Sequence, residues 1–303
     1  MSLYDTTRTS RIPGRIIHKA LERVSPLAVP VLLEIGRETV SGEAADELPA
    51  EAAGVLLREA MVRYEHVAGP FDDAARPVDL ATIEVASVGL HADLSGAAYW
   101  PEQRLLVVAD LHLEKGSSLA ARGLLLPPYD TAATLARLAA VIARHAPRVV
   151  VALGDSFHDG DGAARLADAD RAALAALQRG RDWIWVTGNH DRAPAPGIGG
   201  AFARELVIGP LVFRHEPAAD ETGEIAGHLH PVARVAVRGG TLRRRCFAAD
   251  GARLVMPAFG AYAGGLNVRD AAFADLFGAR RFTAHLLGDQ RLYAFAAAHC
   301  LPD

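Results

Sequence analysis

Three short apolar segments, each ending in a polar cluster, constrain the fold of this chain most strongly. They are RLLVVA at 104–109, RVVVAL at 148–153 and WIWV at 183–186. Their continuously apolar character predicts buried strands. Helical patterns separate them, TAATLARLAAVIARH at 131–145, which we expect Asp130 to cap, and an Ala-rich stretch at 163–179. The resulting β-α-β-α-β order predicts a layered α/β fold.

The segments after the third strand are mostly short and strand-like. They lie at 211–214, 225–226, 233–237 and 254–256. The mixture of strands and helices predicts two packed sheets with helices outside them.

The N-terminal part of the chain has a different character. Residues 45–64 place apolar positions at helical spacing with charges between them, and they contain no acid–base or metal constellation. Residues 66–82 combine Gly, Pro and paired Asp, which is typical of a linker. We therefore predict a helix-rich extension at 1–70, a linker at 71–82 and a catalytic domain at 83–303.

Composition excludes several classes of protein. The net charge of −4 argues against a surface built entirely to hold nucleic acid, although a local basic patch remains compatible with it. No run of about 18 apolar residues predicts a membrane span. The N-terminal residues lack the apolar core of a secretory signal. Only two cysteines are present, which favours a reducing, cytoplasmic setting.

Each predicted strand runs directly into polar residues. Asp110 and His112 follow the first strand, and alternation along an extended chain lets both side chains point at one ion. The carboxyl ends of adjacent strands are where α/β sheets place their sites. Further polar residues follow the other two strands and two short downstream segments. The candidate ligands are Asp110, His112, Asp155, Asn189, His215, His228 and His230, with His158, His190 and Asp191 in the same clusters.

The donor types indicate which ions such a site would take. Imidazole, carboxylate and amide oxygen suit Mn²⁺, Fe²⁺ or Zn²⁺. Thiolate is missing from the set, which argues against a structural zinc site. Seven candidate ligands exceed the need of one ion, and a carboxylate bridging two ions about 3.5–4 Å apart accounts for the surplus.

Each segment taken singly is weak evidence. An isolated Asp-x-His is usually incidental, an isolated Gly-Asp is usually a turn, and His215 alone would more often be a surface or core histidine than a ligand. Gly-Asn-His-Asp at 188–191 is more specific, because four small or polar residues directly after a buried strand need a reason. The combination of all five segments makes a purely structural explanation very weak.

These five segments resemble the signature of the calcineurin-like metallophosphoesterase superfamily. The motifs are D-x-H at 110–112, G-D at 154–155, G-N-H-D at 188–191, a single His at 215 and G-H-x-H at 227–230. The resemblance covers 83–303. It implies an α/β fold in the form of a four-layer α-β-β-α sandwich of two mixed sheets, with a dimetal site at one end of the sheets.

The resemblance implies a role for each matching residue. One divalent ion would be held by Asp110, His112 and His230. The other would be held by Asn189, His215 and His228, and Asp155 would bridge the two. His190 would be the catalytic histidine near the phosphate, held by Asp191. Further candidates for lining the site or contacting substrate are His158, Arg192, Glu114 and Lys115.

A narrower resemblance concerns three other segments. DLHLEKG at 110–116, PAFGAY at 257–262 and GGLN at 264–267 are similar to the bacterial ligase-associated DNA damage response endonucleases known as the PdeM group. That similarity implies a phosphodiesterase with two divalent ions, with Mn²⁺ favoured and Fe²⁺ or Zn²⁺ as alternatives. It also implies DNA as the substrate, and a ligase-associated helicase, a ligase and an exonuclease as partners.

The N-terminal extension resembles a different protein family. RIPGR at 11–15 and SPLAVPVLLEIGRE at 25–38 are similar to the C-terminal tail of the ligase-associated DEAD/DEAH-box (Lhr-like) helicases. The chain has no G-x-x-x-x-G-K-[ST] motif, so this segment is not itself a motor. A gene fusion, a start site that reaches into a neighbouring reading frame, and a simple helical cap on the catalytic domain remain open.

The chemistry implied is in-line attack of a hydroxide held between the metals on phosphorus, in one step. Two alternatives remain: a phosphatase or phosphodiesterase acting on a small nucleotide or lipid diphosphate, and a non-catalytic repair scaffold. A nuclease needs basic walls around its site, for which Arg122, Arg192 and Arg243–Arg245 are candidates. The arginine cluster at 243–245 is more simply explained as a solvated strand edge or loop.

Overall fold

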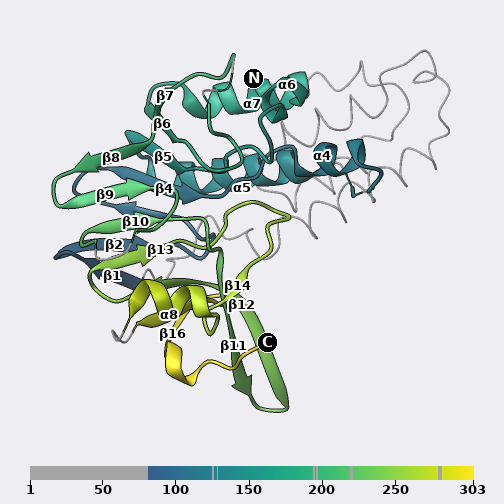
Figure 1. Cartoon of the computed structure of the whole chain (residues 1–303). Helices are drawn as coiled ribbons and strands as arrows, with labels where there is room; N and C mark the ends of the chain where they lie inside the picture. Colours follow the sequence, from purple (N-terminus) through teal and green to yellow (C-terminus); the bar gives the residue numbers. More distant parts are fainter. Residues whose placement is uncertain are drawn as a thin grey trace, which may run out of the picture. The chain divides into compact units, whose positions relative to one another are not determined.

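The computed structural model describes residues 81–303, apart from Leu125, Pro128, Pro194, Pro196, Ala219, Asp220 and 279–281 (Figure 1). The predicted extension at 1–70 and the predicted linker up to residue 80 lie outside the described residues. Residues 81 and 82, which we assigned to the linker, belong to the first described strand. No helix in the described part of the chain is long and apolar enough to cross a membrane.

The first sheet follows the order of the chain. Its strands are β1 (Ala81–Val85), β2 (Val88–Ala92), β3 (Ala98–Trp100), β4 (Leu105–Ala109), β5 (Val149–Leu153), β6 (Asp182–Val186) and β7 (Ala201–Ala203). The pairs from β1 to β4 are antiparallel, and those from β4 to β7 are parallel. The three strands predicted from the apolar segments are confirmed, and their carboxyl ends meet at one edge of the sheet.

The second sheet is built from the rest of the chain. Its strands are β8 (Glu205–Ile208), β9 (Leu211–Arg214), β10 (Glu224–Ala226), β11 (Pro231–Val237), β12 (Gly240–Ala249), β13 (Arg253–Val255), β14 (Leu266–Asn267), β15 (Thr283–Leu287) and β16 (Leu292–Ala296). The main path runs β14-β11-β12-β13-β10-β9-β8, and β15 joins β12 to β16. Parallel and antiparallel pairs both occur, so both sheets are mixed, as predicted.

The helices are α4 (Lys115–Ala121), α5 (Asp130–His145), α6 (Gly162–Arg165), α7 (Asp168–Gln178) and α8 (Ala271–Phe277), with a 3₁₀ turn η2 (Ala297–His299). The single helix predicted at 163–179 is therefore wrong, because the chain leaves the helix at Leu166 and restarts at Asp168. The predicted capping role of Asp130 is also wrong. Asp130 lies inside α5, and its carboxylate accepts from the Gly116 N–H at 3.0 Å.

Three clusters of buried apolar residues show how the layers pack against one another. Alternate residues of β4 point to opposite sides: Leu105 and Val107 join the cluster between the sheets, whereas Leu106 and Val108 pack against the layer that contains α5 and α7. A third cluster joins the second sheet to α8. The helices thus cover the outer faces of two stacked sheets (Figure 1), which is the predicted four-layer sandwich. Burial on both faces explains why β4 and β5 are continuously apolar.

Candidate metal centre

The candidate ligands lie just beyond the ends of strands, on sharply bent backbone. Five of them have a positive φ: Asp110 (55°), His112 (44°), Asp155 (45°), His228 (67°) and His230 (46°). Residues other than glycine rarely adopt this conformation, and each instance costs about 1–3 kcal/mol and persists only where the surrounding structure imposes it. Such strain is concentrated at functional sites, so the bent backbone is an independent indication that these residues serve a site.

Three of the predicted ligands form one half of the centre. The Nε2 atoms of His112 and His230 face one another at 3.3 Å, and Asp110 Oδ1 lies 3.2 Å from His230 Nε2. Two imidazole nitrogens and a carboxylate oxygen thus converge on one point. Their geometry is suited to a metal ion.

The other half is built from an amide and two imidazoles. Asn189 Oδ1 lies 2.9 Å from His215 Nε2 and 3.1 Å from His228 Nδ1, and these two ring nitrogens are 3.2 Å apart. His215 is oriented from behind, because its Nδ1 donates to the Leu153 carbonyl at 3.0 Å. A backbone carbonyl that fixes the far nitrogen of an imidazole is typical of metal-binding histidines.

Asp155 lies between the two halves. Its Oδ1 is 3.4 Å from His215 Nε2, and its Oδ2 is 4.0 Å from His112 Nε2. The His190 N–H donates to Oδ1 at 2.9 Å. The carboxylate therefore faces one histidine of each half, as a bridging ligand must.

The two buried carboxylates of the centre attract positive charge. Asp110 and Asp155 are almost fully buried, and within the described part of the chain the ion pairs of both involve only histidines. Burial alone would raise the pKa of Asp155, but the hydrogen bond and charge of His215 lower it to about 2. Burial alone would lower the pKa of His215, and the two carboxylates raise it to about 9. Buried carboxylates without a Lys or Arg partner are characteristic of cation sites.

The pKa of His112 is shifted in the opposite direction to that of His215. Burial, and next the charge of His230, lower its pKa to about 3. A neutral imidazole is the form that binds a metal ion. The donor set present here therefore fits two divalent cations, each with nitrogen and oxygen ligands.

His190 and His158 flank the first half of the centre. The ring of His190 is 5.2 Å from those of both His112 and His158. His190 Nδ1 donates to the His158 carbonyl at 2.7 Å, and its Nε2 lies 3.9 Å from Asp155 Oδ2. The His190 side chain is 38% exposed. An incoming molecule can therefore reach it, as it can reach His228, which is also exposed.

The ring of His158 lies beside those of His112 and His190. Burial, and next the charge of Lys115, lower its pKa. Its buried Nδ1 has no hydrogen-bond partner among the described residues. With His112 and His190 it forms a further group whose ligand atoms lie within 4.8 Å of one another.

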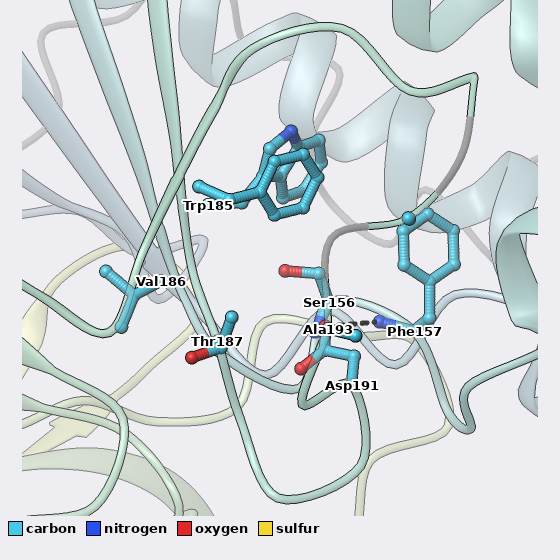
Figure 2. A pocket seen from close by; sticks show the side chains of 9 residues that line it. Ser156, Phe157, Trp185, Val186, Thr187, Asp191 and Ala193 are labelled. Carbon is cyan, nitrogen blue, oxygen red and sulfur yellow. Dashed lines mark hydrogen bonds between the residues drawn. The ribbon is translucent and has the colours of Figure 1, made fainter.

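Asp191 does not do what the sequence predicted. Its Oδ1 accepts from the N–H groups of Gly188 and Asp155, and its Oδ2 accepts from those of Ser156 and Phe157, at 2.7–3.2 Å. The expectation that Asp191 holds the His190 imidazole is wrong. Figure 2 shows the carboxylate beneath Phe157, beside a pocket whose other lining residues are mostly apolar. Asp191 therefore clamps the two ligand-bearing loops together.

Three further candidates, Glu114, Lys115 and Arg192, differ in the groups that they contact. The Glu114 carboxylate accepts from Ser117 Oγ and Thr131 Oγ1, so it joins α4 to α5. Lys115 Nζ donates to the Tyr262 carbonyl at 3.0 Å, and its charge reaches His158. Arg192 is exposed, and its Nε donates to the Asn189 carbonyl at 3.3 Å.

The loop at 257–262 is hydrogen-bonded to the segment that carries Asp110. The N–H groups of Phe259 and Gly260 donate to the carbonyls of Ala109 and Asp110. Arg137 and Arg245 hold the loop in turn, on the carbonyls of Phe259 and Ala258. The segment was noted in the sequence only for its resemblance, and no local pattern signals this supporting role.

Comparisons with known proteins agree with this geometry. Residues 103–246 match the model of a family described as calcineurin-like phosphoesterase, and this range contains every candidate ligand. Among solved structures, the chain is similar to the Pseudomonas putida nuclease MPE, with 29% sequence identity and a TM-score of 0.55. That match covers 72% of this chain and 100% of the other. No curated protein matches the chain. The two matches support a metal-dependent phosphoesterase.

Proposed function

We propose that this chain is a two-metal phosphodiesterase that cuts DNA. The observation that carries the proposal is the arrangement around Asp155, which faces His112 of one donor group and His215 of the other. The similar solved structure is that of a nuclease, which supports a nucleic acid as the substrate. The segments that resemble ligase-associated endonucleases support a place in DNA repair, with a ligase-associated helicase, a ligase and an exonuclease as partners.

We assign the ligands by their grouping in space. Asp110, His112 and His230 would hold one ion. Asn189, His215 and His228 would hold the second, and Asp155 would contribute an oxygen to each. When bound, two divalent cations would stabilise charge on the phosphate oxygens and make hydroxide available near neutral pH. Mn²⁺ is the ion that the narrower resemblance favours.

His190 is the group that we propose to act on the leaving oxygen. A carbonyl oxygen only accepts, so the bond to His158 keeps a proton on His190 Nδ1. The other nitrogen, Nε2, faces the centre 3.9 Å from the Asp155 carboxylate. When Nε2 carries a proton, it can donate that proton to the departing oxygen.

Asp191 supports the reaction without touching the substrate. Its four amide contacts fix the loops that carry Asp155, Asn189 and His190. Positions held in this way limit the movement of ligands between the free and the metal-bound forms. Asp191 is therefore a positioning residue in this proposal.

The proposal is tested by comparing three substrates in the presence of Mn²⁺. The substrates are bis-p-nitrophenyl phosphate, p-nitrophenyl phosphate and supercoiled plasmid DNA, with Asp155→Ala protein as the blank. We expect diester hydrolysis and plasmid nicking, both lost in the blank. Hydrolysis of the small esters without nicking would contradict DNA as the substrate, and metal-loaded protein without activity would contradict the enzymatic role.

A further inference from the structure

The β11–β12 hairpin is unusually basic for this chain. Residues 231–249 contain five arginines and no acidic residue, whereas the whole protein has a net charge of −4. The hairpin extends away from the rest of the second sheet, with its turn at the far end (Figure 1). The arginines are Arg234, Arg238, Arg243, Arg244 and Arg245.

The pairing of the two strands sorts these arginines by face. Arg234 lies directly opposite Arg243, and Val232 lies opposite Arg245. Side chains alternate along a strand, so Arg234, Arg243 and Arg245 share one face. Arg238 lies in the turn at the tip and is exposed. Arg245 is half-buried and donates to the Ala258 carbonyl, so it is not available at the surface. We call Arg234, Arg238 and Arg243 the arginine face.

The arginine face begins beside the metal centre. Arg243 Nη2 donates to the Gly265 carbonyl at 2.8 Å, and the next residue, Leu266, donates its N–H to the carbonyl of His230 at 3.1 Å. The Arg243 side chain is 46% exposed. Arg234 lies level with Arg243 on the facing strand, and Arg238 lies further out, in the turn at the tip.

A carboxylate of the chain itself lies against the arginine face. Asp303 Oδ1 lies 3.4 Å from Arg243 Nε, and the Asp303 side chain is 58% exposed. Arg234 Nη1 donates to the Pro302 carbonyl at 3.2 Å. The guanidinium groups are thus oriented to hold oxygen acceptors at the surface.

We propose that the arginine face binds the sugar-phosphate backbone of the DNA substrate and leads it to the metal centre. This inference rests on the proposed function, because it concerns the same site. Arginine suits the task, since its planar guanidinium matches phosphate oxygens with paired donors. Each neutralised phosphate releases counterions, so the face would supply affinity that depends on salt but not on base sequence.

The test compares two double variants. In the first, Arg234→Ala and Arg238→Ala are combined. Arg243 is kept, because it also holds the Gly265 carbonyl near His230. The matched control combines Arg148→Ala and Arg179→Ala. Both control positions are exposed and precede β5 and β6, at the edge of the first sheet opposite to the metal centre.

Binding is measured with Mn²⁺-loaded protein by fluorescence anisotropy. The probe is a fluorescein-labelled phosphorothioate oligodeoxynucleotide, which resists hydrolysis. We expect the hairpin variant to bind about 10-fold more weakly, with the slope of log K against log salt reduced by about 0.7–0.9 for each phosphate that is no longer neutralised. The control should stay within about twofold of the wild type in affinity, with the same slope. A hairpin variant that matches the control would overturn the proposal.

Asp303→Asn tests the same face with a change that should tighten DNA binding, whereas misfolding would weaken it. The change removes a carboxylate that competes with phosphate for Arg243, so we expect DNA binding to tighten by about twofold or more. Unchanged or weaker binding would contradict competition at this face.

Hydrolysis of bis-p-nitrophenyl phosphate separates the two proposals. If the wild type hydrolyses this diester but its DNA affinity does not respond to the hairpin variant, only the arginine face is refuted. If the wild type with metal bound hydrolyses no diester, the proposed function fails, whatever the hairpin binds.

Discussion

The His190 side chain is held from one side only. Its Nδ1 is fixed by the His158 carbonyl, and its Nε2 faces the metal centre from a partly exposed position. No other hydrogen bond to its ring nitrogens connects it with the described residues. A residue held in this way can change its protonation state without disturbing the ligands, which is what an acid–base group requires.

His190→Ala should therefore separate catalysis from metal binding. We expect bound metal to stay near the wild-type level, while the turnover of bis-p-nitrophenyl phosphate falls by a factor of about 10²–10⁴. Turnover is measured on protein whose metal content is determined in parallel. His299→Ala, at an exposed position in η2, is the control. Near-normal turnover in metal-replete His190→Ala protein would refute the assignment.

At the scale of the elements, the centre depends on close approach of strand ends. A Cβ atom added at Gly227 would lie 2.6 Å from Asp110 Oδ2, and one added at Gly188 would lie 2.2 Å from Asp155 Oδ1. Real Cβ atoms do not come so close to other atoms. These glycines therefore let two loops pass directly over the two buried carboxylates, and a larger residue at either position would displace a ligand.

Gly227→Ala should weaken metal binding more than it weakens the fold. The added methyl group would push the Asp110 carboxylate out of place, and a loss of about 10–100-fold in metal affinity is typical when the support of a ligand is disturbed. Metal titration followed by activity measures this loss. Gly160→Ala is the matched control, because a Cβ at Gly160 meets nothing within 4 Å. Equal affinities in the two variants would contradict the prediction.

The sequence predicts the elements better than it predicts the contacts between them. The strands around 104–109, 148–153 and 183–186 are found because burial on both faces leaves a continuous apolar run. The ligands could be proposed because parallel strands end at a common edge. The break at Leu166 was missed, because an Ala-rich stretch hides where one helix stops and the next begins.

The partners of Asp191 and Glu114 were also missed, for a different reason. Asp191 accepts from Asp155, Ser156 and Phe157, which lie more than thirty residues away in the chain. Glu114 joins two helices through Ser117 and Thr131. Local patterns report period and burial, whereas the partner of a carboxylate depends on which loops fold against it.

At the scale of the whole molecule, a buried charge cluster ties the helical layer to the first sheet. Asp93 follows β2, is fully buried, and accepts from Arg144 Nη1 at 2.6 Å and from His145 Nε2 at 2.9 Å. Both partners lie in the last turn of α5. Burial alone would raise the pKa of Asp93, but His145 and Arg144 hold it far below the ordinary value of 3.8.

Asp93→Ala should destabilise the protein in a way that depends on pH. We expect a loss of about 3–5 kcal/mol in the free energy of unfolding at neutral pH, because buried partners lose their counter-charge. The pKa of Asp93 is lower in the folded state than the ordinary value of 3.8, so its contribution is full above that pH and declines as the pH falls below it. Denaturant unfolding at pH 7 and in acid measures the difference.

The control for this prediction is the exposed pair of Arg244 and Asp289, 3.9 Å apart. Asp289→Ala should change the free energy of unfolding by about 0–1 kcal/mol at most. A gap between wild type and Asp93→Ala that does not narrow in acid would show that Asp93 stabilises the fold by another route.

The most direct test of the central claim is a count of bound metal ions. Native mass spectrometry of Mn²⁺-loaded protein should show two ions per chain in the wild type and in Asp168→Ala, an exposed control in α7. Asp155→Ala should lose bound metal together with diester hydrolysis, because the carboxylate faces both donor groups. Two ions retained by Asp155→Ala, or a single ion in the wild type, would contradict the shared two-metal centre.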